Sequence, residues 1–132
     1  MSARWLSGVL VTVVSTLAVA AANPETTSWS LKRHFRASYV SSPAPVPLLT
    51  VHSWTVTIVD ADEHPVTDAR ITVLGAMPEH DHGFPTLPKV KNLGGGRYLI
   101  EGLKFHMPGN WIVALRIKSG DVTDSVRFEL AL

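Results

Sequence analysis

The residues best suited to chemistry lie in two short stretches of the chain that share histidine, methionine and proline. The first stretch is "MPEHDHGFP" and the second, further along, is "FHMPGNW". Thioether sulfur is a soft donor that suits Cu(I), and imidazole nitrogen binds copper in either oxidation state. Together the two stretches predict a metal site. Its candidate ligands are Met77, His80, His82 and His106, with Met107 and His52 in reserve.

The first stretch has a spacing that suits shared ligation. If the chain is extended here, His80 and His82 project to the same side, with Cα atoms roughly 6 to 7 Å apart. This separation allows two imidazoles to bind one ion at about 2.0 Å per bond. Pro78 and Pro85 restrict the backbone, which lowers the entropy lost when the ligands are ordered.

The second stretch poses a geometric problem, because His106 and Met107 are neighbours and would point to opposite faces of a regular strand. The Pro108-Gly109 pair that follows is typical of a type II turn. We expect the strand to end there and both side chains to reach one rim. His52 is a weaker candidate that shares a strand face with Trp54.

Each of these residues also has an explanation that needs no metal. A lone histidine in a β-protein is usually a surface or hydrogen-bonded core residue, and methionine commonly fills gaps in cores. Zinc is a less favoured metal, and a zinc site would tolerate the loss of both methionines. Its ligands would be His80, His82 and His106.

Other motifs exclude further classes of function. The "LGGGR" stretch lacks the Lys-Ser/Thr of a phosphate-binding loop, and "DADEHPVTD" lacks the glycine and terminal glutamate of an EF-hand. No nucleophile-elbow sequence is present. The chain has no cysteine, which rules out thiolate nucleophiles, blue copper and iron–sulfur clusters. We therefore expect no enzymatic activity.

The 132 residues are 45% hydrophobic, which suits one domain with a substantial core. Arg4 precedes an apolar run over residues 6–22 that ends in small residues, as a secretory signal peptide does. An uncleaved membrane anchor is the rival interpretation, because the run approaches the length that spans a bilayer. Removal of residues 1–22 leaves 11 Lys and Arg beside 11 Asp and Glu, which gives no basic surface for nucleic acid.

The remaining chain is expected to be all-β. A flexible lead-in is predicted over residues 23–32 and one immunoglobulin-like β-sandwich over residues 33–132. Stretches of alternating or β-branched apolar residues, separated by Gly, Pro, Asp and Asn, predict about seven antiparallel strands. The clearest are 34–40, 51–60, 70–76, 97–105, 110–120 and 121–132, with a short run at 89–92.

Several stretches resemble the small exported domains of the YtkA-like and FixH-like group. They are "HSW", "MPEHDHGFPTLPKV" and "GGGRYLIEGLKFHMPGNWIVALRI", and the similarity covers nearly all of residues 35–130. The resemblance implies an immunoglobulin-like β-sandwich outside the cytoplasmic membrane, with a link to copper handling or to assembly of haem-copper oxidases. FixH-type proteins are membrane-anchored, which connects the resemblance to the alternative for residues 6–22.

The leading hypothesis is a periplasmic or otherwise extracytoplasmic copper-binding protein, soluble or anchored in the inner membrane by residues 6–22. It would hold one copper ion and deliver it to a membrane oxidase or another copper protein. The alternative is a non-catalytic interaction module in which the same loop packs against a membrane protein complex without metal. The two hypotheses differ in whether the histidines and methionines converge on one point.

Overall fold

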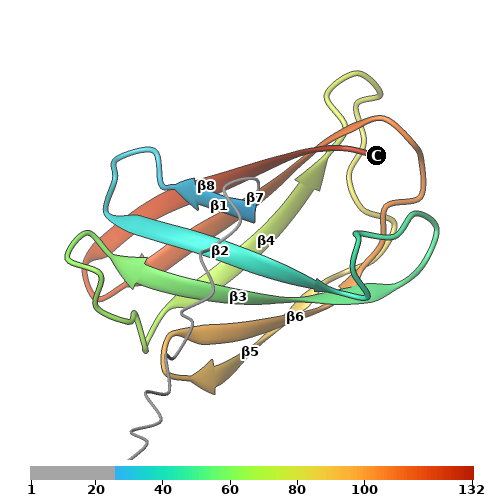
Figure 1. Cartoon of the computed structure of the whole chain (residues 1–132). Coiled ribbons are helices and arrows are strands. Elements are labelled where there is room, and N and C mark those ends of the chain that lie inside the picture. The colour runs from blue at the N-terminus through green and yellow to red at the C-terminus, as the bar shows by residue number, and fades with distance from the viewer. Residues whose placement is uncertain (1–25) are drawn as a thin grey trace, which may run out of the picture.

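The computed structural model describes residues 26–132, which form eight β-strands and no α-helix (Figure 1). The strands are β1 (Thr27–Trp29), β2 (Phe35–Ser42), β3 (His52–Asp60), β4 (Arg70–Ala76), β5 (Lys89–Gly94), β6 (Arg97–Leu103), β7 (Asn110–Ser119) and β8 (Val122–Ala131). Within this part of the chain, no helix has the length and apolar character needed to cross a membrane. The predicted signal peptide or anchor over residues 1–22 lies outside the described residues.

The strands form two antiparallel sheets. One contains five strands in the order β1-β2-β3-β6-β5, and the other contains three in the order β4-β7-β8. Strands β2 to β8 correspond in order to strands A to G of a constant-type immunoglobulin domain, whose sheets are ABED and CFG. The predicted immunoglobulin-like sandwich of about seven strands is therefore confirmed, and β1 is an addition to it.

A flexible lead-in was expected over residues 23–32, but Thr27–Trp29 within this range forms strand β1, and residues 23–25 lie outside the described residues. Thr27–Trp29 pairs in register with β2. The Trp29 ring also lies 4.8 Å from the guanidinium carbon of Arg33 and 5.5 Å from that of Arg36. Such cation–π contacts and backbone pairing stabilise a strand without any apolar alternation of its own. The polar sequence therefore did not reveal it.

The core joins the two sheets through stacked and edge-on aromatic rings. Tyr39 on β2 stacks on Trp54 of β3, with centroids 3.7 Å apart and planes 7° from parallel. Phe128 on β8 meets both rings edge-on, at 4.9 Å and 6.0 Å. Trp54 is completely buried. Because no cysteine is available, these rings make the connection between sheets that a disulfide makes in antibody domains.

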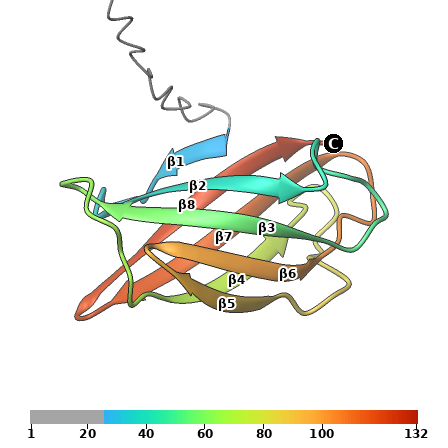
Figure 2. The same ribbon diagram turned by 60° about the horizontal axis from the view of Figure 1, so that its bottom comes forward.

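The alternation of strand directions sends the two His/Met stretches to the same end of the sandwich. Residues 43–51, 77–88 and 104–109 connect β2–β3, β4–β5 and β6–β7, and these three connections lie together (Figure 2). The amide of Leu49 donates to the carbonyl of Phe105 (2.8 Å), which ties the proline-rich connection to the second stretch. We call this the His/Met end.

Candidate metal centre at one end of the sandwich

The first stretch folds as a tight turn and not as the extended segment expected from sequence. The Met77 amide donates to the His82 carbonyl (2.8 Å), and the amides of His80 and Asp81 both donate to the Met77 carbonyl (3.0 Å each). Asp81 has a φ of 51°, in the left-handed region that Asp tolerates. The turn nevertheless places the rings of His80 and His82 side by side, with centroids 5.9 Å apart.

The second stretch brings both of its candidate ligands to His82. The ring of His106 lies 4.8 Å from that of His82, and the sulfur of Met107 lies 3.1 Å from His82 Nε2. The indole of Trp111 donates to the Met107 carbonyl (2.9 Å), which fixes the backbone between the two strands. The chain leaves strand geometry before Pro108-Gly109, so the neighbouring side chains of His106 and Met107 both reach His82 and do not point to opposite faces.

His82 makes two contacts through its ring nitrogens. Its Nδ1 lies 3.2 Å from the Gly83 carbonyl, and its Nε2 lies 3.1 Å from the sulfur of Met107. In a neutral imidazole one nitrogen carries the proton and the other a lone pair. In the tautomer with the proton on Nδ1, the lone pair of Nε2 faces the lone pairs of the sulfur, and metal–nitrogen and metal–sulfur bonds of about 2.0 and 2.3 Å are long enough for one ion to bridge this separation. In this tautomer the two atoms form a pair of soft-metal ligands.

Around this pair, His106 and Trp111 complete an aromatic site. The Nδ1 atom of His106 is buried and has no hydrogen-bond partner among the described residues, as is also true of His52 Nε2 and Trp54 Nε1. The indole N–H of Trp54 is only a donor, so a missing partner does not by itself indicate a metal. Trp111, only 1% exposed, meets the rings of His82 and His106 edge-on at 5.8 and 5.7 Å. It also stacks on Phe84.

The remaining candidates occupy different surroundings. Met77 is 1% exposed and belongs to the hydrophobic core, where its methyl carbon lies 2.8 Å from the position a Cβ would take at Gly109. His80 is exposed at the outer edge. His52 is buried, its Nδ1 lies 2.9 Å from the Thr50 carbonyl, and its ring contacts Phe105. No ring contact within residues 26–132 links His52 to another histidine.

The structure therefore gathers four of the predicted residues. Met77 is buried in the core beside them, with its amide bonded to the His82 carbonyl, and His52 lies apart. We call the gathered set, which consists of His80, His82, His106 and Met107, the His/Met cluster. Trp111 was not among the predicted site residues. Its role depends on the turn at Pro108-Gly109, which folds the indole back under the cluster, and the sequence gives no direct sign of this contact.

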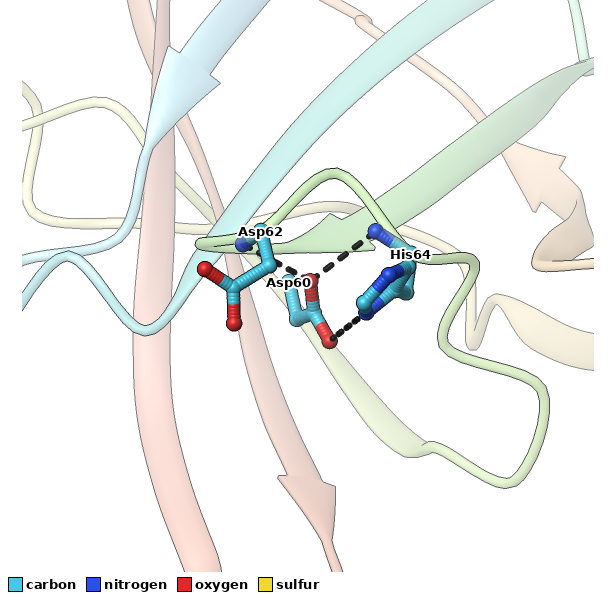
Figure 3. A group of neighbouring side chains, drawn as sticks. All are labelled: Asp60, Asp62 and His64. Carbon is cyan, nitrogen blue, oxygen red and sulfur yellow. Dashed lines mark hydrogen bonds and ion pairs between the residues drawn. The ribbon is translucent and has the colours of Figure 1, made fainter.

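A compact three-residue group of His, Asp or Glu lies instead at the opposite end. In the part of the chain that the structure describes, Asp60, Asp62 and His64 are the only such set with ligand atoms all within 4.8 Å of one another (Figure 3). One oxygen of Asp60 accepts from the amides of Asp62 and His64, at 2.9 Å each. Through these hydrogen bonds Asp60 stabilises the turn between β3 and β4.

Comparison with known proteins gives a family. The model of a family described as YtkA-like matches residues 39–116, a range that contains both His/Met stretches. No curated protein matches the chain. The solved structure "ZirS C-terminal Domain" aligns over 100% of this chain and 87% of its own, with 12% identity and a TM-score of 0.40.

Proposed function

The chain belongs to the YtkA-like family, and from this premise we propose that it binds one copper ion at the His/Met cluster and passes the ion to another protein. His82, His106 and Met107 would hold the ion, and His80 would be an additional ligand near the surface. The FixH-like part of the resemblance and the role in oxidase assembly remain predictions. An extracytoplasmic location likewise remains part of the proposal.

One observation carries the proposal, namely the 3.1 Å separation between His82 Nε2 and the Met107 sulfur. With the ring proton on Nδ1, two electron-pair donors face each other without a hydrogen between them. A cation at this point would be attracted by both atoms, and the unpartnered Nδ1 of His106 lies on an adjacent ring. The donor set fits a soft ion.

The chemistry of the donors favours copper over zinc. Thioether is a poor ligand for zinc but a good one for Cu(I). A zinc site made by three histidines would need their nitrogens close together, yet the imidazoles of His80, His82 and His106 do not form a group within 4.8 Å. We therefore propose monovalent copper as the principal ion.

The exposure of the ligands favours a carrier over a redox enzyme. His82, His106 and Met107 are half-buried, and His80 is exposed. An incoming ligand from another protein could reach such an ion and replace these ligands one at a time. His80, 5.9 Å from the His82 ring, could keep contact with the ion during this exchange.

The test is anaerobic titration of the protein with Cu(I) in the presence of a competing chelator. We expect one ion per chain, with X-ray absorption showing both nitrogen and sulfur neighbours. His82→Ala and Met107→Ala should each weaken binding. His64→Ala, which removes an exposed histidine at the opposite end, is the matched control and should bind copper as the wild type does. Absence of stoichiometric binding would refute the proposal.

The same short contact also supports a metal-free alternative. If the proton of His82 were on Nε2, the ring would donate an N–H···S hydrogen bond to Met107, and the loop could act as a rigid contact surface for a partner. Nitrogen NMR of the metal-free protein distinguishes the two tautomers. An Nε2-protonated ring together with no copper binding would favour the interaction module.

A further inference from the structure

The outer face of the β4-β7-β8 sheet carries positive charge that the balanced composition of the chain conceals. Arg70 on β4 lies directly opposite Lys118 on β7. Arg116 lies two residues from Lys118 on the same face, and Arg127 lies on β8. All four are exposed, and none forms an ion pair within the described part of the chain. Like charges directly opposite each other destabilise a sheet, so the domain carries an unfavourable pair that a bound anion would relieve.

Three of these cations surround one depression in the surface of the sheet. It has a volume of about 140 Å³ and is lined by Arg70, Thr72, Arg116, Lys118 and Thr123. We call these five residues the basic depression. Arg70, Lys118 and Thr123 form one row across the three strands, and Thr72 and Arg116 belong to the next row. Neighbouring side chains in such rows start about 5 to 7 Å apart, so long cationic side chains can reach one common group.

No carboxylate lines the basic depression. Asp68 borders a neighbouring hollow with Arg70 and Lys118, and the Ser119 hydroxyl donates to one of its oxygens at 2.7 Å. Glu129 is exposed on the same sheet but lies four residues along β8 from Ser125, the partner of Arg116. A group inside the depression would therefore meet cations and hydroxyls.

We propose that the basic depression binds a phosphate group. A phosphate ester carries about −1.5 to −2 charges at pH 7 and has three strong acceptor oxygens. The guanidinium groups of Arg70 and Arg116 present paired N–H donors that match two phosphate oxygens, and Lys118 adds a compact positive charge. The threonine hydroxyls supply further donors. A bound phosphate would also offset the repulsion between Arg70 and Lys118.

Two sources of phosphate share this chemistry, and the same face distinguishes them. A soluble phosphate or phosphate monoester would fill the basic depression alone. A phospholipid head group would arrive as part of a bilayer surface, which would also bring phosphates to Arg127 and apolar groups to Leu74. Leu74 is 59% exposed and lies in the same row as Arg127, on the far side of Ala114. Only the lipid source should depend on Arg127 and Leu74.

Inorganic phosphate is the first probe. In NMR titration of the metal-free full chain, sodium phosphate should shift the amides of residues 70–72 and 116–118, whereas sodium chloride at equal ionic strength should not. We expect a millimolar Kd. Arg116→Gln and Lys118→Gln should each weaken binding by about three- to fivefold, as loss of one exposed ion pair does. Arg127→Gln is the matched control, because it removes one charge from the same face outside the depression and should leave the Kd unchanged.

Thermal unfolding separates a ligand site from a structural role. Lys118→Gln removes the repulsion with Arg70, so it should not lower the unfolding midpoint of the phosphate-free protein. Phosphate should raise the midpoint of the wild type, because a ligand of the folded chain stabilises it, and should raise that of Lys118→Gln less. A lysine needed only for folding would give a lower midpoint and an unchanged effect of phosphate.

Vesicle binding identifies the source of the phosphate. Vesicles of phosphatidylcholine are compared with and without phosphatidic acid, so any contribution of residues 6–22 is common to both. A gain from the acidic lipid that falls in Arg116→Gln, Arg127→Gln and Leu74→Ser would assign the site to a lipid head group. Phosphate binding by the depression without such a gain would assign it to a soluble phosphate.

Two results would overturn the proposal. The first is phosphate that leaves the amides of residues 70–72 and 116–118 unshifted, together with vesicle binding that does not change in Arg116→Gln. The second is an equal loss of phosphate affinity in Arg127→Gln and Arg116→Gln, which would show attraction by the whole face and no defined site. Neither result depends on copper binding, because every measurement uses metal-free protein.

Discussion

Met77 and Met107 carry the same thioether, yet only Met107 presents its sulfur to an imidazole. We predict that Met107→Leu lowers Cu(I) affinity by at least about tenfold. Removal of a residue that only supports a metal ligand already lowers affinity by about 10- to 100-fold, and Met107 is itself a proposed ligand. Met77→Leu, in the core, should leave affinity unchanged. Leu and Met have similar volumes, so either change should cost less than about 1.5 kcal/mol of stability. Competitive titration and urea unfolding measure the two effects.

This pair of variants also tests the assignment of the ligands. If Met77→Leu lowers copper affinity and Met107→Leu does not, the core methionine is the ligand and the cluster proposed here is wrong. If both lower it equally, the site extends from the rim into the core.

Gly75 is a second residue that affects the His/Met cluster, because its lack of a side chain leaves room for the Phe84 ring. A Cβ at Gly75 would lie 2.4 Å from the Phe84 ring, which stacks on Trp111. Gly75→Ala should therefore displace Phe84 and destabilise the fold by about 1–3 kcal/mol, as overpacking does. It should also weaken copper binding through Trp111. The double variant with Phe84→Leu should recover part of both losses, and strict additivity in thermal unfolding would contradict the contact.

Residue types allowed a prediction of the donors but not of their surroundings. The soft-donor chemistry of Met107 and the imidazoles is evident from composition, whereas the burial of Met77 and the separation of His52 depend on packing. His52 and Met77 both carry suitable donor atoms. Their different positions follow from strand alternation and from the tight turn after Met77, which the expected extended loop did not include.

At the scale of elements, the β1–β2 hairpin is attached to β8 by backbone contacts of Ser30 and Leu31 and by the buried carboxylate of Asp124. Burial alone would raise the pKa of Asp124, but hydrogen bonds from Ser30 and from the backbone of Ser125, Lys32 and His34 outweigh it and lower the pKa from 3.8 to about 2. The Lys32 amide lies 3.0 Å from one carboxylate oxygen. The charged form of Asp124 thus holds the loop between β1 and β2 in place.

This contact predicts a loss of stability in acid. Because the folded-state pKa is lower than the unfolded one, the stabilisation is complete above about pH 4 and is lost as pH falls toward 2. A shift of this size is worth about 2 kcal/mol. Asp124→Asn should remove this part of the pH dependence, as measured by urea unfolding between pH 2 and 6. Asp121→Asn, exposed in the same β7–β8 hairpin, should retain it.

The strands themselves differ in how well the sequence predicts them. Strand β4 was predicted with its exact bounds, and β3, β7 and β8 to within one residue at each end, because their apolar residues alternate or are β-branched. Strand β1 was missed because its stability comes from β2 and from the cations beside Trp29. Alternating apolar residues indicate a strand with one buried face, whereas β1 has no buried residue.

At the scale of the whole molecule, copper should act as a stabilising ligand. An ion that binds only the folded chain raises stability by about 4 kcal/mol at a thousandfold excess over its Kd. We therefore predict that Cu(I) raises the thermal unfolding midpoint and that a strong chelator reverses the increase. The variant His82→Ala should lose the effect, while His64→Ala should keep it. A rise that persists in His82→Ala would place the ion elsewhere.

The aromatic junction of Tyr39, Trp54 and Phe128 has a consequence for where the domain can mature. No covalent bond has to form or break for the sheets to join, so glutathione, oxygen and disulfide isomerases are irrelevant to its assembly. The polypeptide can acquire its native architecture equally in a reducing cytosol, in an oxidising envelope or in a test tube. Laboratory production should accordingly succeed without any redox buffer.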